Sequence, residues 1–212
     1  MATARSLVTS AILGIASLVT ATAVVSPASA DVAPPDKVAV DIVSVTGSGC
    51  PSGTASVAVS SDRNAFTIFY SGFIAQAGSG VPARDSRRNC QMILKVSKPQ
   101  GYTFGVARID HGGYASLQQG VSAQMQAGYY FAGEASTRQL RHNFYGPLDE
   151  SWQTTDPVGV VSFESCGQQR NLIINTELRV SGGGSASDVN YFSVGSHDGT
   201  TGTTYSLAWK QC

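Results

Sequence analysis

Charge is scarce in this chain, and neither sign dominates. Asp, Glu, Lys and Arg make up 13% of the 212 residues, with 14 basic residues against 14 acidic ones. A basic excess is the usual footprint of a protein that binds nucleic acid or an anionic membrane, so neither partner is expected here. The sequence also lacks an Asn-x-Ser/Thr sequon, and N-glycosylation is therefore not expected.

Long apolar runs are absent after residue 30, but one lies before it. Arg5 precedes an uncharged run over residues 7–25, and Ala28-Ser29-Ala30 matches the small-x-small cleavage pattern. These features predict a secretory signal peptide over residues 1–30, followed by a single secreted β domain over residues 31–212. The alternative is a retained membrane helix, which the Ser and Thr content of the run disfavours. We expect an extracellular protein with no membrane association after cleavage.

Cysteine is limited to four residues: Cys50, Cys90, Cys166 and Cys212. None forms a CxxC pair or has a histidine nearby, which disfavours a zinc site. An even count in an exported chain predicts two disulfides, and three pairings are open. We favour the pairing that is local in sequence, Cys50–Cys90 with Cys166–Cys212. Each bridge would close a loop of about 40 residues and contribute about 4 kcal/mol through chain entropy.

The segment over residues 121–131 gives the clearest structural pattern. Its odd positions are apolar, from Val121 to Phe131, and its even positions are polar or small, from Ser122 to Tyr130. Successive side chains of a strand point to opposite faces, so this alternation predicts a β-strand with one buried face. A helix would spread the same apolar residues around its whole circumference. We interpret the segment as a central strand.

Similar short segments recur along the rest of the chain. They cover residues 38–45, 55–59, 66–70, 91–97, 102–109, 114–117, 140–144, 158–163, 172–180, 189–194 and 205–209. Roughly ten to twelve strands without a convincing helix predict an all-β fold, an antiparallel β-sandwich, with a barrel as the alternative.

Several connections can be predicted from their composition. Residues 76–89 read as a long polar loop, and residues 110–113 as an interruption of a strand. Residues 118–120 suit a short hairpin connection into the strand at 121–131. Ile109 falls out of phase with Phe104 and Val106, which predicts a bulge near Arg108.

With these segments defined, the chain resembles a family of secreted proteins catalogued as domain of unknown function 4360. The motifs that carry the resemblance over about residues 38–212 are Gly49-Cys50-Pro51-Ser52-Gly53, Asp85-Ser86-Arg87-Arg88-Asn89-Cys90, Pro99-Gln100-Gly101-Tyr102-Thr103-Phe104, Gly113-Tyr114-Ala115-x-Leu117, Tyr129-Tyr130-Phe131-x-Gly133, Ile174-Asn175-Thr176 and Leu207-x-Trp209-Lys210-x-Cys212. Phe163-Glu164-Ser165 departs from the Trp-Ser-Pro of the family pattern, which leaves a local packing contact open. The resemblance implies an exported, disulfide-bonded β domain and brings no activity or catalytic residues.

The histidines do not form a recognisable catalytic or metal motif. Ser196-His197-Asp198 has the residue types of a serine hydrolase, but contiguous residues cannot form the triad geometry, and a β-turn is the better interpretation. Asp110-His111 could share a metal with His197-Asp198 only if their loops met, and the sequence gives no sign of it. His142 lies between apolar positions, where we expect a partnered, partly buried imidazole. We expect no metal and no cofactor.

Asp149 and Glu150 beside Trp152 are the best candidates for glycosidase chemistry. That reaction needs two carboxylates about 5–10 Å apart across the scissile bond. Neighbouring acids in one turn more often point apart into solvent, so we do not predict an active site here.

Aromatic residues on a solvated strand face suggest a binding role instead. Tyr130 shares the polar face of its strand with Gln124 and Gln126, a combination that suits ring stacking and amide hydrogen bonds to a sugar. Tyr114 and Trp152 are further candidates for an exposed aromatic strip.

Three functions therefore remain. The first is a non-catalytic module that binds extracellular or cell-wall polysaccharide or another cell-surface component. A structural, surface-associated protein is the second, and an extracellular hydrolase acting on polysaccharide is the third. An exposed aromatic strip would favour the first, a smooth polar surface the second, and a cleft joining two acids the third. The oligomeric state is not indicated.

Overall fold

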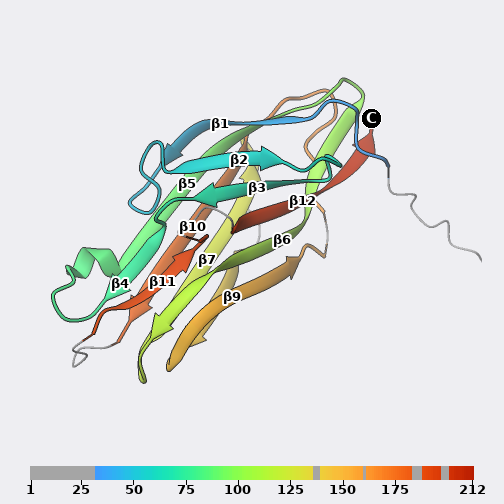
Figure 1. The fold of residues 1–212 in the computed structure, drawn as a ribbon. Coiled ribbons are helices and arrows are strands. Elements are labelled where there is room, and N and C mark those ends of the chain that lie inside the picture. Colours follow the sequence, from blue (N-terminus) through green and yellow to red (C-terminus); the bar gives the residue numbers. More distant parts are fainter. Residues whose placement is uncertain (1–31, 136–138, 160, 183–187, 197–200) are drawn as a thin grey trace, which may run out of the picture. The chain divides into compact units, whose positions relative to one another are not determined.

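The computed structural model describes residues 32–135, 139–159, 161–182, 188–196 and 201–212. These residues form twelve strands in two antiparallel sheets, which confirms the predicted all-β sandwich (Figure 1). The predicted signal peptide, residues 1–30, lies outside the described residues and stays a prediction. Within the described part, no helix has the length and apolarity that a membrane crossing requires.

The five-stranded sheet contains the segment that gave the clearest pattern. Its order is β1 (Ala39–Thr46), β5 (Arg87–Ser97), β10 (Leu172–Ser181), β7 (Ser122–Phe131) and β8 (Leu140–Tyr145). β7 alternates between half-buried and buried positions along its whole length, as its sequence predicts. It pairs with β10 on one side and β8 on the other, so it is an internal strand, while β10 occupies the middle of the sheet.

The seven-stranded sheet is organised around the long strand β6 (Tyr102–Leu117). The other members are β2 (Ala55–Val59), β3 (Ala65–Tyr70), β4 (Ile74–Ala77), β9 (Leu148–Pro157), β11 (Asn190–Val194) and β12 (Gly202–Gln211). β9 pairs with β6 over residues 108–117. β12 and β11 pair with successive parts of β6, so they lie end to end along its other edge (Figure 1).

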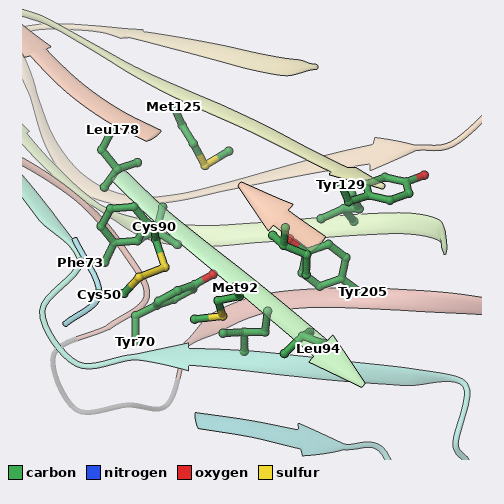
Figure 2. Packing of buried hydrophobic residues seen from close by; sticks show 14 of the residues in the cluster. Cys50, Tyr70, Phe73, Cys90, Met92, Leu94, Met125, Tyr129, Leu178 and Tyr205 are labelled. Carbon is green, nitrogen blue, oxygen red and sulfur yellow. A yellow bond between two sulfur atoms is a disulfide. The ribbon is translucent and has the colours of Figure 1, made fainter. Parts of the chain in front are cut away.

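The core fills the space between the two sheets with apolar and aromatic side chains. Figure 2 shows Met92, Met125 and Leu178 of the five-stranded sheet near Tyr70 and Tyr205 of the seven-stranded sheet. All five side chains are buried. Burial raises the pKa of Tyr70 well above its usual value, although hydrogen bonds with two threonine hydroxyls act in the opposite direction. Tyr70 is therefore a neutral, hydrogen-bonded part of the core.

Both favoured disulfides are present. Cys50–Cys90 links the connection between β1 and β2 to β5, and its Cα atoms are 5.4 Å apart. Cys166–Cys212 ties the last residue to the segment before β10, with Cα atoms 5.6 Å apart. The backbone N–H of Cys212 also donates to the carbonyl of Gly101 at 2.9 Å. The end of the chain is thus held by a covalent bond and a hydrogen bond.

Glu164, at the departure from the family pattern, is a buried charge. Its carboxylate forms an ion pair with Lys98 and accepts a hydrogen bond from the backbone N–H of Arg170. The ammonium of Lys98 also lies 5.6 Å from the centre of the Phe104 ring. An ion pair with a further donor compensates for the desolvation of the carboxylate, so this segment is anchored by charge.

The predicted polar loop over residues 76–89 was too long. β4 extends to Ala77, a 3-10 turn covers Ala83–Ser86, and β5 begins at Arg87. The start of β5 pairs with residues 177–179 of β10, and Arg87 forms an ion pair with Glu177. The first residues of β5 are polar and mostly exposed, so their composition alone did not reveal a strand.

Two further expectations about β6 were wrong, and one was right. Residues 110–113 continue the strand, because β9 satisfies one edge of the backbone and β11 and β12 satisfy the other. Residues 118–120 do not close a hairpin; they connect β6 in one sheet to β7 in the other. The bulge near Arg108 is confirmed, because the pairing with β12 skips Ala107.

Candidate functional site

A hollow of about 760 Å³ lies over β4, β11, β6 and β9. We call it the tyrosine groove. The side chains that the pleat and the strand register direct toward it are Ile74, Gln76, Tyr114, Ser151, Gln153, Tyr191 and Ser193.

Strand register explains why these residues meet. Tyr114 of β6 is paired with Ser193 of β11 on one side and Ser151 of β9 on the other. Ser193 is in turn paired with Ile74 of β4. Residues that are paired in register share a face of the sheet, so this row crosses four strands on the outer face. The alternate residue Ala115 is fully buried and faces the core.

Two stacked tyrosines form the most distinctive part of the groove. The rings of Tyr114 and Tyr191 are 6.0 Å apart and nearly parallel, at 17°. The hydroxyl of Tyr114 donates to Asp149 at 3.1 Å, and this hydrogen bond raises the pKa of the phenol. Ser193 holds the backbone of Tyr114 from the neighbouring strand, with two contacts of 3.3 Å. The aromatic pair is therefore fixed in orientation while remaining half-buried.

Polar side chains beside the tyrosines are free to bind a ligand. Gln76, Ser151 and Gln153 line the groove, and their side chains have no hydrogen-bond partner among the described residues. Each amide offers two donors and an acceptor, and the hydroxyl offers both. A half-buried aromatic surface with a few convergent polar groups is typical of a small-molecule or glycan site.

One edge of the groove, at Gln153, adjoins a glycine of β6. Gly112 of β6 lies opposite Gln153, and its backbone accepts a hydrogen bond from the N–H of Gly195 at 2.8 Å. A Cβ atom on Gly112 would lie 2.8 Å from the methyl group of Thr201, so a side chain here would displace Thr201, which lines the groove. Gly112 itself is buried, and its missing side chain lets Thr201 lie close against β6.

Trp152 does not provide an exposed aromatic surface, in contrast to the expectation from sequence. Only 6% of it is exposed. Its ring stacks on Phe192 at 5.1 Å and also contacts Phe144 at 4.9 Å. It is paired with Gly113, on the side of β9 that faces the core. Trp152 supports the groove from beneath, and its buried indole nitrogen has no hydrogen-bond partner in the described structure.

The other sequence-predicted residues lie on a different surface. Tyr130, Gln124 and Gln126 belong to β7 and face outward from the five-stranded sheet, so they cannot form one site with Tyr114. Gln124 donates to Asn143 at 2.8 Å, and Gln126 donates to Gln139 at 2.9 Å.

These amides are therefore used in contacts between neighbouring strands. Gln126 also accepts a hydrogen bond from Arg141 at 3.0 Å. Tyr130 is paired with Ile173, and Ile173 with Ile93, so its neighbours on this face are aliphatic.

Asp149 and Glu150 lie in strand β9 and not in a turn. As adjacent strand residues they point to opposite sides, so they do not face each other across a substrate. Asp149 contacts Tyr114, as described above. Of the described residues that line the tyrosine groove, none is acidic.

Two histidines converge on one carboxylate between the sheets. His142 is partly buried and lies 2.7 Å from Asp156, which confirms the expected partnered imidazole. His111 lies 3.9 Å from the same oxygen, and burial lowers its pKa to about 4. His197, its predicted partner at a metal, lies outside the described residues. In the described part of the chain, no group of three His, Cys, Asp or Glu side chains is arranged to hold a metal ion.

Sequence reasoning identified Tyr114 but missed Tyr191, Gln76 and Gln153. The strand at 189–194 was predicted, and its parity already separates Tyr191 from the buried Phe192. What the sequence does not contain is the register that places β11 and β4 beside β6. That register depends on pairing between residues far apart in the chain.

With the geometry established, the comparisons with known proteins assign the family. The sequence profile described as "Domain of unknown function (DUF4360)" matches residues 36–212. The chain belongs to this family.

A relative from Arthroderma benhamiae is described as an "Uncharacterized secreted protein". It is 33% identical over 184 residues, which cover 84% of this chain and 73% of the relative. Together with the two disulfides, this relative indicates that the DUF4360 protein is secreted.

Two solved structures are similar at a low level. One is the carbohydrate-binding module TmCBM61 in complex with β-1,4-galactotriose, with a TM-score of 0.28, 11% identity and coverage of 85% of this chain and 92% of that one. The other is the enzymatically active domain of bacteriophage CBA120 tailspike protein 4, with a TM-score of 0.26, 10% identity and coverage of 80% and 19%. At these TM-scores, neither likeness supports a function for this chain.

Proposed function

We propose that this protein is a non-catalytic extracellular module that binds polysaccharide in the tyrosine groove. The observation that carries the proposal is the stacked pair Tyr114 and Tyr191 beside polar side chains that have no partner in the part of the chain that the structure describes. Sugar rings have apolar faces that stack on aromatic rings and hydroxyl edges that hydrogen-bond to amides. The groove presents both kinds of surface within one hollow.

Several features favour binding over hydrolysis. Among the described residues that line the tyrosine groove none is acidic, and Asp149 and Glu150 point to opposite sides of β9. A glycosidase would need two carboxylates facing each other across the sugar, held about 5–10 Å apart. These side chains therefore support binding of a glycan without cleavage of its bonds.

Affinity electrophoresis in gels containing soluble glycans tests the proposal. The panel contains hydroxyethyl cellulose, galactomannan and laminarin as neutral polymers, and polygalacturonate as an anionic one. We expect at least one neutral polymer to retard the wild-type protein. We expect Tyr114→Ala to weaken that binding by about tenfold, the effect of losing about 1.4 kcal/mol of stacking.

Tyr130→Ala is the matched control, because it removes the same side chain from the outer face of the other sheet. It should be retarded like the wild type. Loss of binding in Tyr130→Ala but not in Tyr114→Ala would move the site to the five-stranded sheet. Retardation by no polymer would reject the proposal and favour a structural role.

A further inference from the structure

A second hollow adjoins the tyrosine groove on the same face of the sheet. It has a volume of about 420 Å³ and lies over β3, β12, β6 and β9. We call it the threonine hollow. The outer-face residues that define it are Thr67, Phe69, Asp110, Thr155 and Thr204.

The two hollows share part of their lining. Gln153 and Thr201 line both of them. The pairing also continues in register, because Asp110 lies between Thr204 of β12 and Thr155 of β9. From Tyr114 to Arg108 along β6, this surface runs for about 20 Å at the usual rise per strand residue. Such a length spans several sugar units.

From this continuity we infer that the two hollows form one extended groove for an internal segment of a linear, neutral polysaccharide. The inference rests on the proposed function and specifies its ligand. The polysaccharide would run along β6. Some of its sugar units would lie over Tyr114 and Tyr191, and the adjoining units would lie over the threonine hollow.

The threonine hollow has its own aromatic surface. Phe69 is half-buried on the outer face of β3 and is paired with Gly202 of β12. Gly202 has no side chain, so β12 presents only backbone beside the ring. Phe69 can therefore stack on a sugar as the tyrosines do at the other end.

Hydrogen-bonding groups line the rest of this hollow. One oxygen of Asp110 accepts from Arg108 at 2.7 Å and from Thr155 at 2.6 Å. The other oxygen has no partner among the described residues. Partial burial alone would raise the pKa of Asp110, but these hydrogen bonds lower it, so the free oxygen is an ionised acceptor for a sugar hydroxyl.

The charge of the groove favours a neutral glycan. Among the described residues that line either hollow, Arg108 is the one cation besides histidine, and it is paired with Asp110. His111 is neutral because burial depresses its pKa to about 4. Among these described lining residues, a polymer of uronic acids or sulfated sugars would meet no unpaired positive charge.

Calorimetric titration with oligosaccharides of increasing length tests the inference. The series runs from dimer to hexamer and is derived from the neutral polymer that retards the protein. We expect the affinity of the wild type to rise by about tenfold from dimer to hexamer, the gain from about 1.4 kcal/mol of added contacts. Phe69→Ala should abolish most of that gain while leaving dimer binding unchanged.

Tyr145→Ala is the control, because Tyr145 is 71% exposed on β8 of the other sheet. It should retain the full dependence on length. If affinity does not depend on length and Phe69→Ala is neutral, the extended groove is rejected while the proposed function stands. If no glycan binds, or Tyr114→Ala has no effect, the proposed function fails first. Equal affinity for polygalacturonate would overturn the neutral ligand.

Discussion

The outer faces of the two sheets contain similar residues that are used in different ways. On the five-stranded sheet, Gln124 and Gln126 hydrogen-bond to side chains of neighbouring strands or of the adjoining segment. On the seven-stranded sheet, Gln76 and Gln153 have no such partner in the described structure. A polar residue on a strand is therefore a candidate for ligand binding only when its neighbours do not already satisfy it.

Glycine explains much of the difference in shape between the faces. The seven-stranded sheet has Gly112 and Gly202 on its outer face and Gly113 on its inner face, all close to other chain segments. On the five-stranded sheet, a Cβ atom on Gly128 would make only an ordinary contact of 3.8 Å with the side chain of Gln139. The three glycines of the seven-stranded sheet allow other chain segments to approach closely, whereas the surroundings of Gly128 leave room for a side chain. Three measurements can sharpen or break this comparison.

The largest expected effect is a loss of stability when a methyl group is added to Gly113, on the seven-stranded sheet. A Cβ atom on Gly113 would lie 1.9 Å from the carbonyl oxygen of Ser193 and 2.7 Å from the ring of Trp152. Neither can move freely, so Gly113→Ala should lower the free energy of unfolding by about 3 kcal/mol or more. Urea denaturation measures the change.

Gly128→Ala is the matched substitution on the five-stranded sheet. Its Cβ would meet only the side chain of Gln139, at 3.8 Å. We expect no loss of stability, or a gain of about 0.5 kcal/mol from reduced backbone entropy. Equal destabilisation by both substitutions would contradict the close packing of Ser193 and Trp152 against Gly113.

The second effect concerns pH and the buried histidine between the sheets. His111 faces Asp156 of β9, His142 of β8 and Thr203 of β12. Its pKa is about 4, below the usual 6.5, mainly because it is buried. As pH falls from 6.5 to 4, the unfolded chain binds a proton that the folded protein does not.

The free energy of unfolding should therefore fall across this window by about 3 kcal/mol, and the contribution is fully present above pH 6.5. Denaturation curves at several pH values measure it. In His111→Gln, the slope between these pH values should be largely lost, whatever the variant's absolute stability. The same slope in both proteins would contradict the assignment to His111.

The smallest effect is expected on the solvated face of the five-stranded sheet. Burial alone would raise the pKa of Glu177, but hydrogen bonds from Arg87 and Arg179 outweigh it and lower the pKa. Both arginines are about half exposed, at 62% and 48%, so solvent screens these ion pairs. Glu177→Gln should cost less than about 1 kcal/mol, and added salt should reduce the difference. A cost of several kcal/mol would show that this network contributes to stability as a buried one would.

Sequence patterns predicted the strands better than the surfaces. The alternation of Val121 to Phe131 was sufficient for β7, and of the three open cysteine pairings the favoured, sequence-local one is confirmed. Strand β9 was missed because polar residues occupy most of it. The connection at residues 118–120 was misread because a short turn does not reveal whether the next strand joins the same sheet.

The candidate site could be predicted only in part. Tyr114 was identified as an aromatic on a strand, but Trp152 was expected at the surface and lies in the core. Tyr191 lies beside Tyr114 because β11 pairs with β6, which links residues about 75 positions apart. Sequence periodicity does not encode such a non-local pairing. Residue type indicated the kind of ligand contact, and strand register decided which residues lie together in one site.

One measurement tests the central contrast between the two faces directly. In a ¹⁵N-labelled sample, the side-chain amides of Gln76 and Gln153 report on the groove, and those of Gln124 and Gln126 report on the other sheet. On titration with hexamers of the neutral glycans, we expect the first pair of signals to shift and the second pair to stay in place. Shifts confined to Gln124 and Gln126, or none with any glycan, would contradict the account.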